Sequence, residues 1–204
     1  MKAILFDIDG VLLRHDTWFI EEFCKGYGEE AFSVMLEYCN GDEIAKCDKG
    51  YADSYSEILP FLKRIGYKGT VEEFFELKNE FESRGIDYFA LNKIKQINNE
   101  KIKCFIGSNQ DKRRKQFLIK ALKLDEVVTE SYFSCDFNYM KPEKEYWEIA
   151  HWKMEKYLGK IEPYNILFFD DRVENIHSAS DYGFSVVHVK NKDDLYIRLN
   201  EIMS

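Results

Sequence analysis

The chain has 204 residues, of which 45% are hydrophobic and 32% charged, and its formal net charge is −8 at pH 7. This length suits one core of ordinary size, or a core with a small inserted domain, and the composition is that of a folded globular protein. The acidic balance argues against a nucleic-acid partner or an anionic membrane surface, and no segment approaches the roughly 20 apolar residues of a membrane span.

Neither the start of the chain nor its cysteines suggest export. After Met1 and Lys2 the apolar run ends at Phe6, which is too early for a signal peptide. The five cysteines are scattered and include no Cys-x-x-Cys pair, which disfavours a zinc or redox site. We therefore expect a soluble protein of a reducing, cytoplasmic compartment.

The first expected element is a short apolar strand that ends in two carboxylates. Residues 3–6 are all apolar, and they are followed by Asp7, Asp9 and Gly10. Such a run is typical of a strand buried in a parallel sheet, and ligands bind at the carboxyl ends of such strands. The two aspartates therefore stand where a site belongs, although Asp-x-Asp-Gly alone is as typical of a turn.

A long stretch without strands follows. In chain order the pattern predicts a helical segment over 17–39 with a break near Gly26 and Gly28, a polar turn-rich segment over 40–50, and helices over 55–65 and 71–81. A crossover in a parallel sheet does not need so many helices. We therefore expect an inserted all-helical cap domain over 15–85, above Asp7 and Asp9, on a core made of residues 1–14 and 86–204.

From residue 86 onward, strands and helices alternate. The predicted strands cover 102–107, 132–134, 165–169 and 184–189, and the predicted helices cover 88–98, 111–123, 143–157, 173–182 and 193–203. This alternation predicts an α/β fold with a doubly wound, Rossmann-like parallel sheet. The basic run 112–115 falls on one of the helices, and we expect it to form a solvated helix face.

Polar side chains with a common chemistry collect at the strand ends and in one loop. They are Asp7, Asp9, Ser108, Asn109, Lys141, Asp170 and Asp171. Four carboxylates in one cleft repel each other unless a cation holds them, and ligation by oxygen alone favours Mg²⁺. The Lys141 ammonium and the Ser108 hydroxyl are donors that suit an anion. Together these groups indicate a phosphoryl-transfer site, in which one aspartate is the nucleophile and a second moves protons.

These residues resemble the four motifs of the haloacid dehalogenase-like hydrolase superfamily. The motifs are Asp7-Ile8-Asp9-Gly10-Val11, Ser108 after an apolar strand, Lys141, and Asp170-Asp171 after another apolar strand. They occur in the family's order and span essentially the whole chain, and the helical insert matches the position of the family's C1 cap. Within the superfamily the chain looks most like small cytosolic phosphatases that resemble alpha-glucose-1-phosphate phosphatase.

The resemblance implies a Mg²⁺-dependent phosphatase that hydrolyses a small phosphomonoester, such as a sugar phosphate or a nucleotide-like compound, through an aspartyl-phosphate. By the same resemblance, Asp7 is the nucleophile, Asp9 is the general acid/base, and Lys141 holds the phosphate and Asp7. The implied phosphate ligands are Ser108, Asn109 and Lys141, and the implied metal ligands are Asp7, the Asp9 carbonyl, Asp170 and Asp171. Asp171 would bind the metal directly, and Asp170 either directly or through water.

Three alternatives stay open at this stage. Dehalogenases of this superfamily lack the second aspartate, so Asp9 favours phosphoryl chemistry, but a phosphomutase would use the same core. A catalytically idle protein that binds phosphate or a partner is the third. His15 and Trp18 follow the nucleophile closely enough to line the substrate pocket, but a large aromatic such as Trp18 is more often part of a core. The sequence does not indicate the oligomeric state.

Overall fold

The computed structural model describes residues 1–100 and 102–204, and in these residues five parallel strands form one sheet in the order β3-β2-β1-β4-β5. The strands are β1 (Ala3–Phe6), β2 (Lys103–Ser108), β3 (Glu130–Phe133), β4 (Ile166–Asp170) and β5 (Ser185–His188). β1 lies in the centre, where Ile4 is in register with Cys104 of β2 and Leu167 of β4. The predicted α/β fold with a parallel sheet is confirmed.

Helices cover both faces of the sheet, because successive residues of a buried strand point to opposite faces. Ile4 and Phe6 of β1 belong to one apolar cluster, whereas Ala3 and Leu5 belong to another. The first cluster is completed by α6 (Tyr88–Glu100), α7 (Lys112–Ala121), α8 (Leu124–Val127) and α12 (Lys192–Met203), and the second by α10 (Lys144–Leu158) and α11 (Val173–Tyr182). The short helices α9 (Ser134–Phe137) and η1 (Pro163–Asn165) complete the core.

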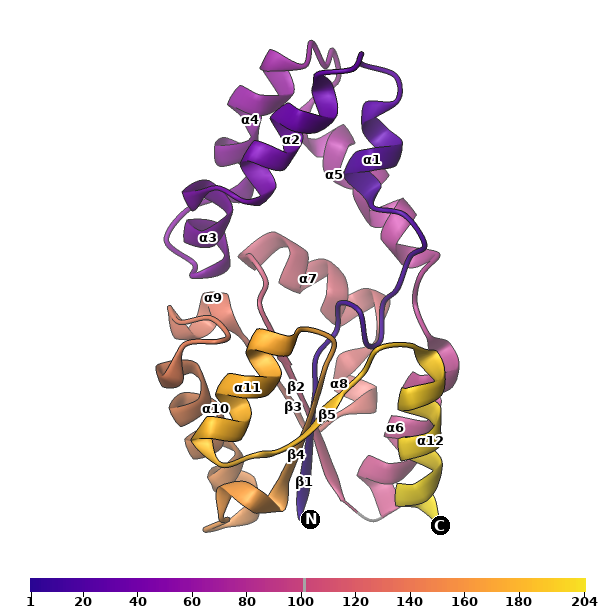
Figure 1. Cartoon of the computed structure of the whole chain (residues 1–204), viewed down its shortest axis with the longest axis vertical. Helices are drawn as coiled ribbons and strands as arrows, with labels where there is room; N and C mark the ends of the chain where they lie inside the picture. Colours follow the sequence, from indigo (N-terminus) through magenta and orange to yellow (C-terminus); the bar gives the residue numbers. More distant parts are fainter. Residues whose placement is uncertain (101) are drawn as a thin grey trace.

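The first five helices after β1 stand apart from this core, on the side to which the strands' carboxyl ends point (Figure 1). They are α1 (Phe19–Cys24), α2 (Ala31–Cys39), α3 (Asp42–Asp48), α4 (Ser54–Arg64) and α5 (Val71–Ser83). They enclose an apolar cluster of their own, which includes Met35, Ile58 and Phe74. We refer to α1–α5 as the cap.

The chain passes to the cap and back through two segments that pair with each other. The Arg14 N–H donates to the Gly85 carbonyl, and the Asp87 N–H donates to the Leu12 carbonyl, both at 2.9 Å. Two adjacent crossings of this kind allow an inserted unit to keep its own core. This pairing supports the division into a core of 1–14 and 86–204 and a cap of 15–85, which stays a prediction.

The cap also departs from the sequence expectations at two places. Residues 40–50, predicted as turns, contain α3, whose first turn begins with Asp42 and Glu43. A proline such as Pro60 usually starts or kinks a helix, but α4 begins six residues earlier, at Ser54, where the Asp53 side chain caps it. Pro60 and Ser56 are both exposed, so water can hydrate the Ser56 carbonyl that Pro60 cannot pair with.

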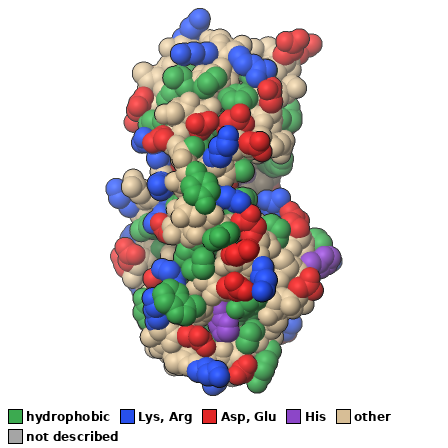
Figure 2. Space-filling model, turned by 90° about the vertical axis from the view of Figure 1, so that its left-hand side faces the viewer, with side chains coloured by type: hydrophobic (Ala, Val, Ile, Leu, Met, Phe, Trp, Pro, Cys, Tyr) green, Lys and Arg blue, Asp and Glu red, His purple; other side chains and the backbone are tan. Residues whose placement is uncertain are grey.

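The surface adds two observations. None of the helices in the described part of the chain is long and apolar enough to cross a membrane. On the face shown in Figure 2, acidic and basic side chains are interspersed over both the cap and the core. The side chains drawn there form no continuous basic stripe of the kind that tracks a nucleic acid backbone.

Candidate active site

The turn after β1 places Asp7 and Asp9 at the carboxyl edge of the sheet. The Asp7 N–H donates to the Phe169 carbonyl of β4 at 2.9 Å, which extends the sheet pairing by one residue and fixes the Asp7 backbone. Gly10 has a φ of +69°, and a Cβ built on it would lie 2.2 Å from Asp171 Oδ2. Glycine is required here because any side chain would collide with the Asp171 carboxylate.

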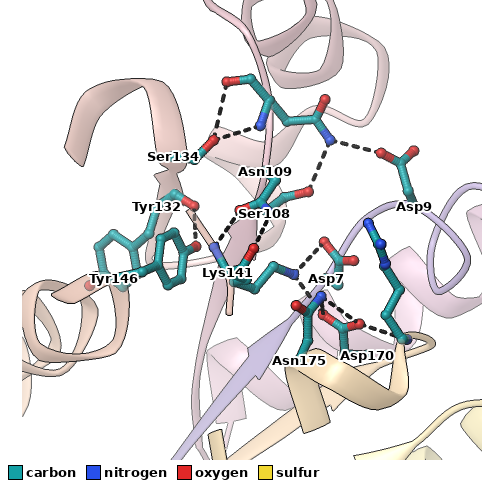
Figure 3. A network of polar contacts seen from close by, with 12 residues as sticks. Asp7, Asp9, Ser108, Asn109, Tyr132, Ser134, Lys141, Tyr146, Asp170 and Asn175 are labelled. Atoms are coloured by element: carbon teal, nitrogen blue, oxygen red, sulfur yellow. Dashed lines mark hydrogen bonds and ion pairs between the residues drawn. The ribbon is translucent and has the colours of Figure 1, made fainter. Parts of the chain in front are cut away.

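Lys141 lies between two of the carboxylates (Figure 3). Its Nζ is 3.0 Å from Asp7 Oδ1 and 2.6 Å from Asp170 Oδ2, and its side chain is 1% exposed. Asn175 donates to both Asp170 oxygens at 3.1 Å, and the Arg172 N–H donates to Asp170 Oδ1 at 2.8 Å. Asp170 is therefore fully engaged within the protein, and it orients Lys141 toward Asp7.

Burial and the neighbouring carboxylates disfavour the ionised form of Asp7. Burial raises the pKa of Asp7 to about 7; the nearby Asp170 and Asp9 carboxylates add to the rise, and Lys141 opposes it. Burial alone would lower the pKa of Lys141, but Asp7 and Asp170 outweigh it and raise that pKa above its usual value. One lysine does not balance the carboxylates around it, so further positive charge is favoured here.

Three of the carboxylates are arranged to hold such a charge. Asp7, Asp170 and Asp171 each place an oxygen within 4.8 Å of the others. Asp171 Oδ1 is buried without a hydrogen bond from the described residues, and the same holds for Asp7 Oδ1 beyond its ion pair with Lys141. Burial, followed by the neighbouring Asp170, raises the pKa of Asp171. Two unsatisfied buried oxygens in an all-oxygen donor set fit a hard divalent cation such as Mg²⁺.

The residues after β2 connect this cluster to the loop that carries Lys141. Asn109 donates to the Lys141 carbonyl and accepts from the Lys141 N–H, both at 2.8 Å. Its amide therefore positions the lysine loop. The Ser108 hydroxyl accepts from Gln110 Nε2 at 2.9 Å, and the same nitrogen donates to Asp9 Oδ2 at 2.9 Å. The roles predicted for Ser108 and Asn109 in binding phosphate stay predictions.

Sequence reasoning missed Arg114. Its guanidinium binds Asp9 through two nitrogens, at 2.5 and 2.7 Å, and its Nε is 3.1 Å from Glu82 of the cap helix α5. Burial by itself would raise the pKa of Asp9, but Arg114 and then Gln110 outweigh it and hold that pKa well below its usual range. Asp9 is therefore ionised in this arrangement. No local pattern in the sequence sets Arg114 apart from its basic neighbours, because its partners Asp9 and Glu82 lie far away in the chain.

Lys112 and Arg113 of the basic run are exposed, as predicted for a solvated helix face, but they also contact the cap. Lys112 donates to the Gly50 carbonyl at 2.9 Å, and Arg113 binds Asp53 at 2.6 Å. The Arg113 guanidinium also lies over the Tyr55 ring, 3.6 Å from its centre. Together with Arg114–Glu82, these contacts join α7 of the core to three separate parts of the cap.

A cavity of about 450 Å³ lies between the cap and the sheet edge. Its floor includes Asp7, Asp9, Ser108, Lys141 and Asp171. Such a volume is at the low end of the range for small-molecule sites and does not suit a large ligand.

The two residues predicted for the substrate pocket lie beside this cavity. Among the described residues, His15 and Trp18 line a neighbouring hollow, which shares Asp9, Arg114 and Asp171 with it. His15 is 4.3 Å from the Phe81 ring, measured between ring centres. Trp18 is 65% exposed, so the alternative place in a cap core is wrong. A substrate role for either residue stays a prediction.

Comparison with known proteins identifies the family. The model of the haloacid dehalogenase-like hydrolases matches residues 1–183 of the 204. The chain belongs to this family. A search of curated proteins finds no match. The sequence resemblance to the superfamily is therefore confirmed, while the C1 subtype and the closer likeness to alpha-glucose-1-phosphate phosphatase stay predictions.

Solved structures of this family share the fold. A predicted hydrolase of the family from Porphyromonas gingivalis matches with a TM-score of 0.77 at 18% identity, covering 100% of this chain and 98% of that one. The enzyme BT-2542 from Bacteroides thetaiotaomicron, in complex with magnesium and inorganic phosphate, matches with a TM-score of 0.70 at 21% identity, covering 92% and 93%. L-2-haloacid dehalogenase from Xanthobacter autotrophicus, with chloropropionic acid covalently bound, matches with a TM-score of 0.63 at 17% identity, covering 91% and 76%.

Proposed function

We propose that this hydrolase is a Mg²⁺-dependent phosphatase of small phosphomonoesters. The observation that carries the proposal is the pairing of two features at one sheet edge. Lys141 bridges Asp7 and Asp170 beside an Asp171 oxygen that is buried without a partner among the described residues, and a second aspartate, Asp9, stands two residues after the first. The first feature suits a cation and a phosphate together, and the second supplies the group that a phosphate ester needs for proton transfer.

The reaction has two steps at phosphorus. In the first, a carboxylate oxygen of Asp7 forms a bond to phosphorus, the bond to the ester oxygen breaks, and the leaving oxygen takes a proton from Asp9. In the second, Asp9 takes a proton from water, whose oxygen attacks phosphorus; the bond to Asp7 breaks, and inorganic phosphate is released. Lys141 orients Asp7 and offsets the charge of the phosphoryl group in both steps.

Mg²⁺, held by Asp7, Asp171 and the Asp9 carbonyl, would neutralise charge on the phosphoryl oxygens when bound. Asp171 suits direct ligation because one of its oxygens is free, whereas Asp170 already accepts hydrogen bonds on both oxygens. The enzyme BT-2542, which shares the fold, has magnesium and inorganic phosphate in its structure.

The contact with Arg114 suits one of the two roles of Asp9 and opposes the other. The bidentate contact holds Asp9 ionised, which is the state that accepts a proton from water in the second step. To donate a proton in the first step, Asp9 must turn away from Arg114 and take up a proton from solvent, because the ionised carboxylate carries none. Glu82 gives Arg114 a second partner on the cap, so the guanidinium stays paired when Asp9 turns away.

Phosphate release from p-nitrophenyl phosphate tests the proposal. We expect release with Mg²⁺, loss of release with excess chelator, and a loss of more than about 10³-fold in Asp7→Asn, because the nucleophile is gone. Asp181→Asn, which changes an exposed aspartate on α11, is the matched control and should retain activity.

Three other outcomes would contradict the proposal. Chloride release from 2-chloropropionate without phosphate release would indicate a dehalogenase. Conversion of a sugar phosphate to its isomer without free phosphate would indicate a phosphomutase. No turnover of any of these compounds would leave a protein that binds phosphate or a partner without catalysis.

A further inference from the structure

The cap side of the active-site cavity is mostly apolar. It is lined by Ile20, Ile44, Ile58, Phe74 and Phe75. Phe74 and Phe75 belong to the cap's own apolar cluster, so their positions are fixed by packing. A wall of this kind favours an aliphatic or aromatic body over a ring covered with hydroxyl groups, because each buried hydroxyl needs a hydrogen-bond partner.

Several polar groups of the cavity are already engaged within the protein. The Ser54 hydroxyl donates to Asp111 at 2.9 Å, and Lys78 donates to Glu82. Arg114 is shared between Asp9 and Glu82. A polyhydroxylated substrate would have to break these contacts to be bound.

Two polar groups on the cap wall differ from these. The Tyr38 side chain of α2 is 4% exposed, and its hydroxyl has no hydrogen-bond partner among the described residues. Asp48, the last residue of α3, lines the same cavity, and no contact with a cation or hydrogen-bond donor is found for its carboxylate in the described part of the chain. The two helices pack against each other, and each residue belongs to the cavity lining.

Asp48 has charged neighbours but no hydrogen-bond partner of its own among the described residues. Burial, followed by the like charges of Asp111 and Asp9, raises the pKa of Asp48 to about 7, against the opposing charges of Arg114 and Lys78. The carboxylate would be relieved by a hydrogen-bond donor or a cation supplied from the cavity, and the Tyr38 hydroxyl would gain its missing partner from the same ligand.

We propose that the cavity selects phosphomonoesters with a compact apolar or aromatic body that ends in one hydrogen-bond-donating group, a hydroxyl or an ammonium, received by Asp48 and Tyr38. This inference rests on the proposed phosphatase function and names its substrate class. The phosphate lies on the sheet edge, the body lies against Phe74 and Phe75, and the donor reaches the α2–α3 side of the cap. Sugar phosphates are poor substrates, because the cap wall offers too few hydrogen-bond partners for their hydroxyl groups. Esters with a second anionic group are poor substrates, because the Asp48 carboxylate repels that group.

A matched set of esters tests this selection. The pair is 2-(4-hydroxyphenyl)ethyl phosphate and 2-phenylethyl phosphate, which differ by one hydroxyl, with 2-(4-carboxyphenyl)ethyl phosphate and glucose 6-phosphate as the disfavoured classes. We expect the wild type to prefer the hydroxylated ester over the phenyl ester by about tenfold or more in kcat/KM, because its hydroxyl pairs groups that are otherwise unsatisfied. An aminomethyl analogue of the same ester distinguishes a preference for ammonium from one for hydroxyl.

Variants of the two cap groups show whether they cause the preference. Asp48→Ala and Tyr38→Phe should each bring the ratio for the matched pair toward one. Asp42→Asn, an exposed aspartate at the other end of α3, and Tyr27→Phe, a cap tyrosine outside the cavity lining, should keep the wild-type ratio. Retention of the wild-type ratio in both Asp48→Ala and Tyr38→Phe would contradict the proposal.

Binding separates failure of this inference from failure of the proposed function. Calorimetric titration of the two matched esters into Asp7→Asn requires no turnover. Equal affinity, or tighter binding of glucose 6-phosphate, would overturn the proposed substrate class even if p-nitrophenyl phosphate is hydrolysed. Tighter binding of the hydroxylated ester would support it even if the wild type releases no phosphate.

Discussion

The sheet edge and the cap wall enclose the same cavity, but their polar groups are arranged in opposite ways. At the sheet edge, Lys141 and Asp170 have partners from several elements, and the free oxygens are confined to a cluster that suits a cation. On the cap wall, the Tyr38 hydroxyl and the Asp48 carboxylate have no hydrogen-bond partner among the described residues, although charged side chains such as Asp111 and Arg114 lie near Asp48. The difference indicates that the sheet edge is organised before the substrate arrives, whereas the cap wall is completed by it.

Arg114 is the link between these two regions, and its removal has the largest effect that we expect on stability. Its side chain is 15% exposed and its partner Glu82 is 8% exposed. Arg114→Met should lower the free energy of unfolding by about 3 kcal/mol, because it removes the ion pair of the half-exposed Asp9 and leaves the buried Glu82 with Lys78 alone. Urea denaturation measures the loss.

The double variant provides the control. Arg114→Met combined with Asp9→Asn removes the carboxylate whose only ion pair among the described residues is with Arg114, and it should recover part of the lost stability. If the double variant is no more stable than Arg114→Met, this ion pair is not the cause of the loss.

The sequence predicted the sheet edge well and the contact between cap and core badly, for a physical reason. A buried apolar run that ends in carboxylates, as at Asp7 and Asp170, is a local pattern with one reasonable explanation. Arg114 sits in a run of four basic residues, and only its distant partners Asp9 and Glu82 show that it points inward. Periodicity does not distinguish an exposed charge from one whose partner lies far away in the sequence.

The cap also has features that the sequence does not reveal. Tyr38 lies in the helical segment predicted over 17–39 and is buried, but no sequence pattern reveals that its hydroxyl lacks a partner among the described residues. α3 was missed because Asp42–Asp48 offers few apolar residues, and its helix is stabilised by packing on α2 and α4.

Lys141 tests the sheet edge through activity. Lys141→Met should lower kcat for p-nitrophenyl phosphate by about 10²–10³-fold, the range typical of losing one fixed group that stabilises developing charge. Steady-state kinetics at saturating Mg²⁺ give the value. Lys144→Met, which changes an exposed lysine at the start of α10, is the control. A loss below about threefold, well short of that range, would contradict the role assigned to Lys141.

A variant of Asp7 tests whether the charge at the sheet edge destabilises the folded protein when no metal is bound. Its pKa is raised from 3.8 to about 7, so the ionised form is disfavoured in the folded protein, and the metal-free wild type should lose stability as the pH rises from about 4 to about 7. In excess chelator, Asp7→Asn should therefore be more stable than the wild type at pH 8, by about 2 kcal/mol, since each pKa unit corresponds to 1.36 kcal/mol and the loss of the Lys141 contact offsets part of the gain.

The pH dependence is the decisive part of that comparison. At pH 5 the Asp7 carboxyl of the wild type is itself protonated, so the difference between the two proteins should shrink. Thermal melting at both pH values measures it. An advantage of Asp7→Asn that is equal at pH 5 and pH 8 would show that the charge of Asp7 is not responsible.

Arg113 should give the smallest effect, although it is next to Arg114. Its side chain is 44% exposed and that of its partner Asp53 is 46% exposed, so solvent screens the pair. Arg113→Ala should lower the free energy of unfolding by no more than about 1 kcal/mol in the same urea experiment. A loss as large as that of Arg114→Met would mean that exposed contacts hold the cap as strongly as buried ones.

The most direct test of the central claim is to find the phosphoryl group on Asp7 during turnover. Wild type and Asp9→Asn are mixed with p-nitrophenyl phosphate and Mg²⁺, quenched in acid after short times, and mapped by peptide mass spectrometry. The account predicts a phosphorylated peptide modified at Asp7, with more of it in Asp9→Asn because the base that activates water is missing. Release of phosphate with no phosphorylated Asp7 at any quench time, in either protein, would contradict the account.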